Sequence, residues 1–206
     1  SNIFIDVGAK DDKEVRKMGI RVGSVLAFED GFTTLNNGRW FCGRALDNRI
    51  GGYMIAEVAR KLAKNKIDLP FTLYVVNAVQ EEVGLRGAQM IAHRLKPDLA
   101  LVVDVTHDTQ TPMIDKNKEG DIRAGKGPVL MVGPSVHNNL LRELRDVAEK
   151  AKIPFQFDSA SRSTGTDTDA FAYSNQGVAS ALISLPLRYM HTTVEMCASE
   201  DVEAVI

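Results

Sequence analysis

The chain has 206 residues, of which 44% are hydrophobic and 25% are charged, and its formal net charge is −2. This composition is typical of a soluble globular protein with one main core and room for a small second unit. A nearly neutral chain without a basic stripe excludes the electrostatic footprint of a nucleic-acid-binding protein, and no apolar stretch is long enough to span a membrane.

The first part of the chain, residues 1–43, is expected to form a small, mostly β unit. Extended apolar runs flank a short helical segment, and Asn36-Asn37-Gly38 is a typical hairpin turn between two of these runs. The elements expected here are a strand over residues 3–8, a helix over Asp12–Met18, and strands over Ile20–Phe28 and Phe32–Cys42.

The pattern changes after Gly43, where helical and strand signals begin to alternate as in an α/β layered structure. Phe71–Val79 and Asp98–Val105 are almost continuously apolar, which fits buried strands better than half-exposed ones. The other expected strands are Val129–Val132, Pro154–Phe157 and Val178–Ser184. Helices are expected over Ile50–Leu62, Ala88–Leu95, Ser135–Lys152 and Ala170–Ser174, with one more that begins near Ser199.

Cysteine usage and the N-terminal sequence bear on the cellular compartment. The two cysteines, Cys42 and Cys197, lack the spacing of a metal site, and no secretory signal opens the chain. Reduced, buried thiols are the simplest interpretation, so we expect a cytoplasmic protein.

Two adjacent carboxylates, Glu81 and Glu82, follow the apolar run that ends at Val79. Like charges this close repel each other, and desolvated carboxylates either take up a proton or bind a cation. A divalent metal that binds one acid and leaves its neighbour free to transfer protons accounts for the pair.

Other potential ligands occupy similar places, because Asp47, Asp104 and His191 each lie where an expected strand gives way to a loop. Ligand sites in open α/β sheets gather beyond the carboxyl ends of the strands. Carboxylates with an imidazole suit zinc, cobalt or manganese, and three carboxylates fit two ions with a bridging acid better than a single zinc. Position alone leaves open the ordinary alternatives of a turn-capping aspartate, a packed histidine and solvated glutamates.

Five motifs recur in a fixed order along the chain: Ala45-Leu-Asp-Asn-Arg49, Val79-Gln-Glu-Glu-Val-Gly84, Val102-Val-Asp-Val-Thr-His107, Gly165-Thr-Asp-Thr-Asp-Ala170 and Leu187-Arg-Tyr-Met-His-Thr-Thr193. This series resembles that of the glutamyl aminopeptidase and tetrahedral (TET) aminopeptidase family of co-catalytic metallopeptidases. The resemblance covers essentially the whole chain. It implies a three-layer α/β catalytic domain with a mixed, largely parallel sheet over residues 44–206, and it makes residues 1–43 the remnant of a small β-barrel-like insertion and dimerisation domain.

The resemblance also implies a role for each candidate residue. Asp47 would bridge two divalent ions, with zinc or cobalt expected, and would precede a cis peptide bond to the next residue. Asp104 would bind the first metal, whereas Glu82 and His191 would bind the second. Glu81 would be the general acid/base.

Peptides are the substrates that the resemblance implies, and homo-oligomers built from dimers are the implied assembly of the intact protein. The loop Ser163–Asp169 resembles the substrate-side loop of the family, so Thr166 and Asp167 are candidate substrate-side residues. An ordinary loop of side-chain-to-backbone turns is the structural alternative.

One departure from the family pattern concerns the first metal. Its remaining ligand in the family is a histidine in a segment that precedes the small β domain, and none of His93, His107 and His137 matches that motif. We therefore expect the N-terminal part of the catalytic domain to be missing, the first site to be weakened, and the activity of this chain to be impaired.

Two other functions remain as alternatives. A glycoside hydrolase needs two carboxylates that face each other across a sugar, which adjacent residues on one extended segment do not easily provide. A non-catalytic scaffold that folds, oligomerises or binds a partner without turnover is the other alternative.

Overall fold

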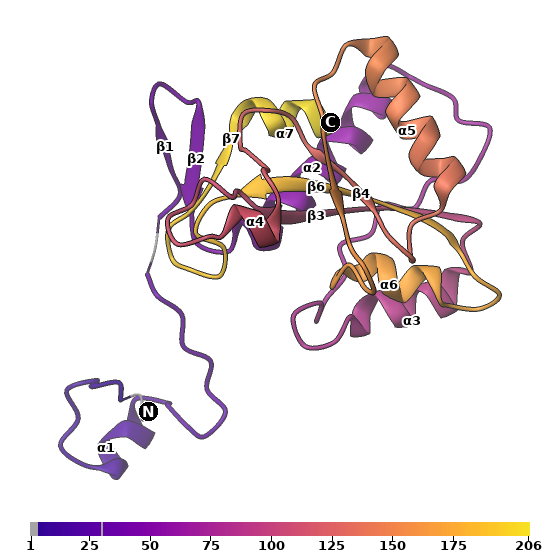
Figure 1. The fold of residues 1–206 in the computed structure, drawn as a ribbon. Helices are drawn as coiled ribbons and strands as arrows, with labels where there is room; N and C mark the ends of the chain where they lie inside the picture. Colours follow the sequence, from indigo (N-terminus) through magenta and orange to yellow (C-terminus); the bar gives the residue numbers. More distant parts are fainter. Residues whose placement is uncertain (1–3, 30) are drawn as a thin grey trace.

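The computed structural model describes residues 4–29 and 31–206, and its fold is drawn in Figure 1. The described residues form an α/β protein with a four-stranded mixed sheet and a separate three-stranded antiparallel sheet. The expected α/β class is therefore confirmed. No helix in the described residues combines the length and apolar character that crossing a membrane requires.

The larger sheet has the strand order β3-β6-β4-β5. Its strands are β3 (Leu99–His107), β4 (Val129–Val132), β5 (Gln156–Ser159) and β6 (Ala179–Leu187). β3 pairs with β6 and β4 with β5 in parallel, whereas β4 and β6 are antiparallel. β6 is buried along most of its length because it lies in the middle of the sheet with strands on both sides.

Helices cover both faces of this sheet and complete three layers. Figure 1 shows α2 (Leu46–Lys64) and α7 (Ser199–Val205) on one side, with α3 (Arg86–Leu95) and α6 (Asp167–Ala172) on the other. α5 (Asn138–Ala151) packs against β4 and β6. The main core cluster joins α2, β3, β6, β7 and α7 through Leu46, Ile50, Met54, Val105, Leu185, Leu187, Cys197 and Val202.

The smaller sheet pairs two strands from the N-terminal part of the chain with one strand near the C-terminus. β1 (Thr33–Leu35) and β2 (Trp40–Gly43) form the expected hairpin, and β2 also pairs with β7 (Glu195–Ala198). In the described residues this sheet is open rather than barrel-like. The helix α1 (Asp12–Lys17) lies on a segment that extends away from both sheets (Figure 1). The domain boundary at residues 43 and 44 stays a prediction.

The expected buried strand over Phe71–Val79 is wrong, because these residues form no strand. Phe71 and Val79 are 63% and 66% exposed. A buried strand needs hydrogen-bonded neighbours at its edges and packed layers on its faces, and the described residues provide neither for this segment. Within residues 4–29 and 31–206, β3 in turn pairs with β6 alone.

The strand expected over Ile20–Phe28 is also absent, because a turn closed by a hydrogen bond from the Ser24 amide to the Arg21 carbonyl interrupts it and no strand pairs with it. The strand expected over residues 3–8 is absent from residues 4–8, while Ile3 lies outside the described residues. The short helix α4 (Lys116–Glu119) and β7 were not expected.

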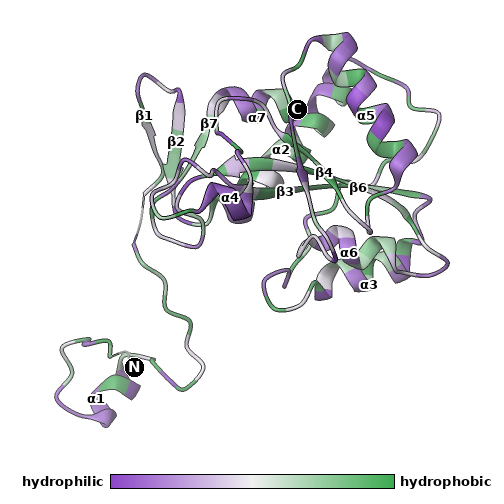
Figure 2. Cartoon of the chain, in the orientation of Figure 1, coloured by the Kyte–Doolittle hydropathy of each residue, from purple (hydrophilic) through white to green (hydrophobic). Residues whose placement is uncertain are grey.

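Two helices begin at positions that their caps decide. α6 begins three residues earlier than expected because the Thr166 side chain accepts a hydrogen bond from the Thr168 amide. α5 begins after His137, whose ring accepts from the Leu140 amide. Figure 2 shows hydrophobic residues concentrated along the strands of the larger sheet, whereas α4 is hydrophilic.

Candidate metal centre

Asp47 lies at the irregular start of α2, where the side chain of the next residue, Asn48, holds a backbone that lacks helical geometry. Asp47 and Asn48 have non-helical dihedral angles, and the peptide bond between them is cis, as expected. The Asn48 side chain donates to the Val103 carbonyl of β3 at 2.8 Å and accepts from the Gly51 amide at 2.9 Å. A Cβ at Gly51 would collide with the Asn48 side chain, so only glycine fits there. Asn48 thus joins the start of α2 to β3.

Glu81 and Glu82 lie on a compact loop between residues 79 and 87. The Leu85 amide donates to the Glu81 carbonyl at 3.0 Å, and the Gly87 amide donates to the Val79 carbonyl at 2.9 Å. The backbones of Gly87 and Val79 approach so closely that a Cβ on Gly87 would overlap the Val79 main chain. These backbone contacts close the loop that carries both carboxylates.

His191 lies on the loop between β6 and β7. Arg188 and Met196 close this loop with two backbone hydrogen bonds of 2.8 and 3.0 Å. The Glu195 carboxylate then folds back into the loop and accepts from the His191 amide at 2.8 Å. Its other oxygen accepts from the Asp47 amide at 3.1 Å.

A buried ion pair supports the same loop. The Arg188 guanidinium donates to the Asp108 carboxylate at 2.7 Å, and Asp108 is fully buried. The guanidinium also lies 4.6 Å from the centre of the Trp40 ring. Arg188 thereby connects the end of β6 to both the end of β3 and the small sheet.

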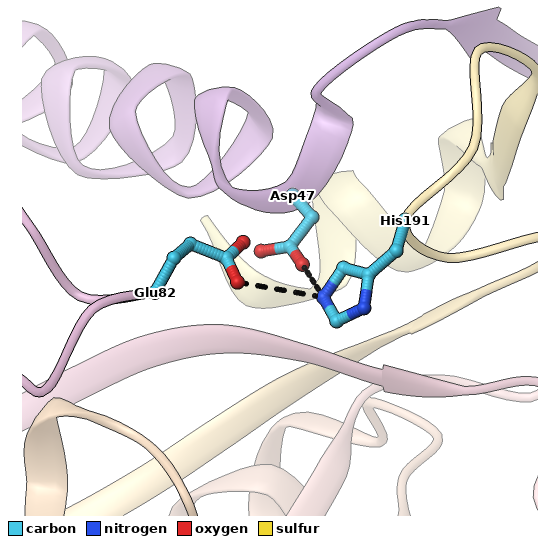
Figure 3. Close-up of side chains that lie close together, drawn as sticks. All are labelled: Asp47, Glu82 and His191. Atoms are coloured by element: carbon cyan, nitrogen blue, oxygen red, sulfur yellow. Dashed lines mark ion pairs between the residues drawn. The ribbon is translucent and has the colours of Figure 1, made fainter. Parts of the chain in front are cut away.

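Three side chains from these distant segments converge in Figure 3, where Asp47, Glu82 and His191 point toward one another. His191 Nε2 lies 3.0 Å from an Asp47 oxygen and 3.6 Å from a Glu82 oxygen. One ligand atom from each residue lies within 4.8 Å of the others. Two carboxylate oxygens and one imidazole nitrogen are a donor set that zinc, cobalt and related ions accept, so these residues fit a divalent metal.

The acids around this group carry raised pKa values. Burial, followed by repulsion from Glu82, raises the pKa of Asp47 to about 6 and that of Glu81 to about 7. Burial also raises the pKa of Asp104 to about 7, although a hydrogen bond from the Val105 amide opposes the shift. Burial and mutual repulsion raise the free energy of the ionised carboxylates, and a divalent cation bound between them lowers it again.

Glu81 and Asp104 lie near the group without belonging to it. Among the described residues, the set of ligand atoms within 4.8 Å of one another contains neither of them. Repulsion from the Asp47 carboxylate nevertheless helps to raise the pKa of each of them. Asp104 lies on β3 opposite Ser184 of β6, and one of its oxygens accepts from the next backbone amide at 2.8 Å.

The two expected substrate-side residues differ in their surroundings. The Thr166 hydroxyl caps α6 and hydrogen-bonds to the side chains of Thr164 and Thr168. Burial raises the pKa of Asp167, and repulsion from Asp167 helps to raise the pKa of Glu81. One Asp167 oxygen is buried without a hydrogen-bond partner, whereas the Thr166 hydroxyl is engaged in the helix cap.

Sequence reasoning missed Glu195, whose carboxylate contacts the backbones of two candidate ligands. A signal for it exists in the sequence, because Glu195 interrupts the apolar stretch Val194–Ala198, where an unpaired carboxylate would be costly. The side-chain role of Asn48 was also missed.

Comparison with known proteins places this geometry in a family. The family model described as M42 glutamyl aminopeptidase matches residues 1–206. The lysyl aminopeptidase of Pyrococcus furiosus is 39% identical over 207 residues, which are 100% of this chain and 57% of that protein. The chain therefore spans a little over half the length of this relative.

Two solved structures share the fold. A TET aminopeptidase from a marine sediment archaeon, Thaumarchaeota archaeon SCGC AB-539-E09, has a TM-score of 0.90 at 35% identity, over 97% of this chain and 56% of that one. The TET1 peptidase of Pyrococcus horikoshii, described as assembling into a tetrahedron or a large octahedral shell, has a TM-score of 0.74 at 27% identity, over 96% of this chain and 56% of that one. With a family match that spans every residue, the chain belongs to the M42 glutamyl aminopeptidase family.

Proposed function

We propose that this chain forms the metal-binding catalytic part of an aminopeptidase, which removes N-terminal residues from peptides. The observation that carries the proposal is the convergence of Asp47, Glu82 and His191 beside Glu81. Family membership and the aminopeptidase relatives support it.

Asp47, Glu82 and His191 would hold one divalent ion, with zinc or cobalt as the expected metal. A metal ion bound there supplies positive charge that polarises a peptide carbonyl and acidifies nearby water. Asp104 and Asp47 would hold the other ion, which is the first metal of the family pattern. That ion would bind more weakly, because these two are the only described residues assigned to it and Asp104 lies outside the three-residue ligand group.

Glu81 is the residue that we assign to proton transfer. Its carboxylate is not a member of the ligand group, which leaves it free to exchange a proton. In the metal-free chain, burial is the largest cause that raises the pKa of Glu81, to about 7. A carboxylate with a raised pKa suits a group that takes a proton from the attacking water and returns it to the leaving amine, because a catalyst of proton transfer works best when its pKa is near the operating pH. The neighbouring Glu82, held toward His191, has the different role of a ligand.

Asp167 is the residue that we assign to the substrate side. Its unpartnered oxygen and its electrostatic effect on Glu81 and Asp104 support a place near the reacting groups. A carboxylate there would attract a positively charged group such as the free amino terminus of a peptide. Thr166 would act indirectly, as the cap that fixes the backbone before Asp167.

A homo-oligomer is the assembly that we propose for the intact protein. The support is the similarity to the TET1 peptidase, which is described as forming a tetrahedron or an octahedral shell. No described residue bears directly on the number of subunits.

Paired substitutions test the proposal. Glu81→Gln should abolish hydrolysis of aminoacyl-p-nitroanilides and leave the zinc content unchanged, because it removes a proton carrier and no ligand. Glu82→Gln should lose zinc, measured by elemental analysis after dialysis, because an amide is a poorer ligand than a carboxylate. The reverse pattern would exchange the two roles.

Treatment with a chelator distinguishes the proposed aminopeptidase from the two alternative functions. EDTA should abolish peptide hydrolysis by the wild type. Hydrolysis of a glucan that survives EDTA would instead support a glycoside hydrolase, and zinc-loaded intact protein that turns over no aminoacyl substrate would support a scaffold.

A further inference from the structure

One buried carboxylate contacts two candidate metal ligands through their backbones. Glu195 on β7 is 2% exposed. One of its oxygens accepts from the His191 amide at 2.8 Å, and the other accepts from the Asp47 amide at 3.1 Å. Asp47 and Glu195 are 148 residues apart in the sequence. The β2–β7 ladder already places Gly43 opposite Glu195, and the Glu195 side chain extends this contact to Asp47 and His191, which lie beyond the paired residues.

Local backbone geometry does not fix either ligand by itself. His191 has a φ of 62°, in the left-handed region that non-glycine residues seldom adopt, and Asp47 has non-helical dihedral angles at the start of a helix. The His191 side chain is 63% exposed, so packing restrains it little. Both segments therefore depend on hydrogen bonds from outside, and Glu195 supplies one to each.

From this arrangement we infer that Glu195 is a positioning residue that holds the backbones of Asp47 and His191 at the separation a shared metal requires. This inference rests on the proposed function, because it assumes that both residues bind one ion. It adds a residue that touches neither metal nor substrate and acts only through the two ligands. Groups that orient metal ligands typically change metal affinity by about 10- to 100-fold when they are mutated.

The chemistry demands a carboxylate of this length at position 195. Two backbone N–H groups need two acceptors, and a glutamate offers one oxygen to each. A glutamine offers a single oxygen, so its NH2 group would face one of the two N–H donors. Because Glu195 is buried, water does not readily replace the lost bond. Glu195→Gln is therefore nearly isosteric and still breaks one arm of the contact.

Asp201 provides a matched control a few residues away. It is 1% exposed, and its two oxygens accept from the Gly125 and Gly127 amides at 2.6 and 2.7 Å. Asp201→Asn therefore removes the same kind of bond from a buried carboxylate. Neither glycine belongs to the ligand group, so a general loss of stability and a loss of ligand positioning are separable.

The first measurement is amide hydrogen exchange on the metal-free chain, followed by NMR. In the wild type, the amides of Asp47 and His191 should both exchange slowly, although the His191 side chain is exposed. Glu195→Gln should speed up exchange at one or both of these amides by roughly tenfold or more, whereas Asp201→Asn should leave them unchanged. Fast exchange of both amides in the wild type would overturn the inference, even if the Glu195 variant failed to fold.

The second measurement is the affinity for cobalt by calorimetry, together with the visible spectrum of the bound cobalt. Glu195→Gln should bind cobalt about 10- to 100-fold more weakly, with an altered spectrum, and Asp201→Asn should match the wild type in both. Equal affinity in wild type and Glu195→Gln, or equal weakening in both variants, would overturn the inference. Wild type that binds no cobalt would refute the proposed metal function, and the exchange data would then decide alone whether Glu195 holds the two backbones.

Discussion

Asp104 is a buried acid of the candidate site, at 7% exposure, and ionisation of its carboxyl group should destabilise the metal-free protein. Its pKa is raised from 3.8 to about 7, mainly by burial. A group whose pKa is higher in the folded state binds protons preferentially there, so stability falls as the pH rises from about 4 to about 7. Asp104→Asn removes this titration and keeps an oxygen that can accept from the Val105 amide.

The shift gives the size of the effect. The pKa of Asp104 is 3.8 as an ordinary value and about 7 in the folded protein. Relative to low pH, this shift lowers the free energy of unfolding by roughly 4 kcal/mol at pH 8 and by roughly 1.5 kcal/mol at pH 5. The advantage of Asp104→Asn over the wild type should therefore grow by roughly 2 to 3 kcal/mol between these pH values. Effects of the substitution that do not depend on pH cancel in this difference.

Urea denaturation in EDTA at pH 5 and pH 8 measures the difference. A stability difference for Asp104→Asn that stays constant or shrinks as the pH rises would refute the reasoning.

Three other predictions follow from particular contacts. Gly87→Ala should weaken zinc binding, measured by calorimetry, because a Cβ there overlaps the backbone of Val79 and displaces the loop that carries both glutamates. Unchanged zinc affinity would contradict the account of how this loop is closed. Asp108→Ala should lower the free energy of unfolding by about 1 to 3 kcal/mol in urea, because it leaves the partly exposed Arg188 guanidinium without its buried partner, and a loss below about 0.5 kcal/mol would contradict this. Burial raises the pKa of the Cys197 thiol to about 12, so a thiol reagent at pH 8 should modify it only after unfolding. Rapid modification in the native state would show that the thiol is accessible.

Much of the larger sheet could be predicted from local patterns. β4 matched its expected bounds, and β3 and β6 were each longer than expected because their parallel pairing continues to His107 and Leu187. The strand expected over Phe71–Val79 shows the limit of this reasoning. Its apolar run satisfies the pattern of a buried strand, but a strand also requires a partner, and partners are a property of the tertiary structure.

The candidate site, like the larger sheet, could be predicted only in part. The sequence predicted that Asp47, Glu82 and His191 would meet, and the structure brings these three together, although the segment before Glu82 forms no strand. The contacts that hold them were not visible. Glu195 and Asn48 act through bonds to backbone groups far away in the sequence, and the spacing of residues carries no signal for such bonds. The roles assigned to the three residues that meet, and those of Glu81, Asp104, Thr166 and Asp167, stay predictions.

The central claim is that Asp47, Glu82 and His191 bind one divalent ion together. Anomalous diffraction at the zinc edge, from crystals grown with zinc, tests it most directly. The account predicts a peak about 2.0 to 2.2 Å from a nitrogen of His191 and from one oxygen each of Asp47 and Glu82. A zinc peak that lacks any of these three ligands, or zinc bound only elsewhere on the chain, would contradict it.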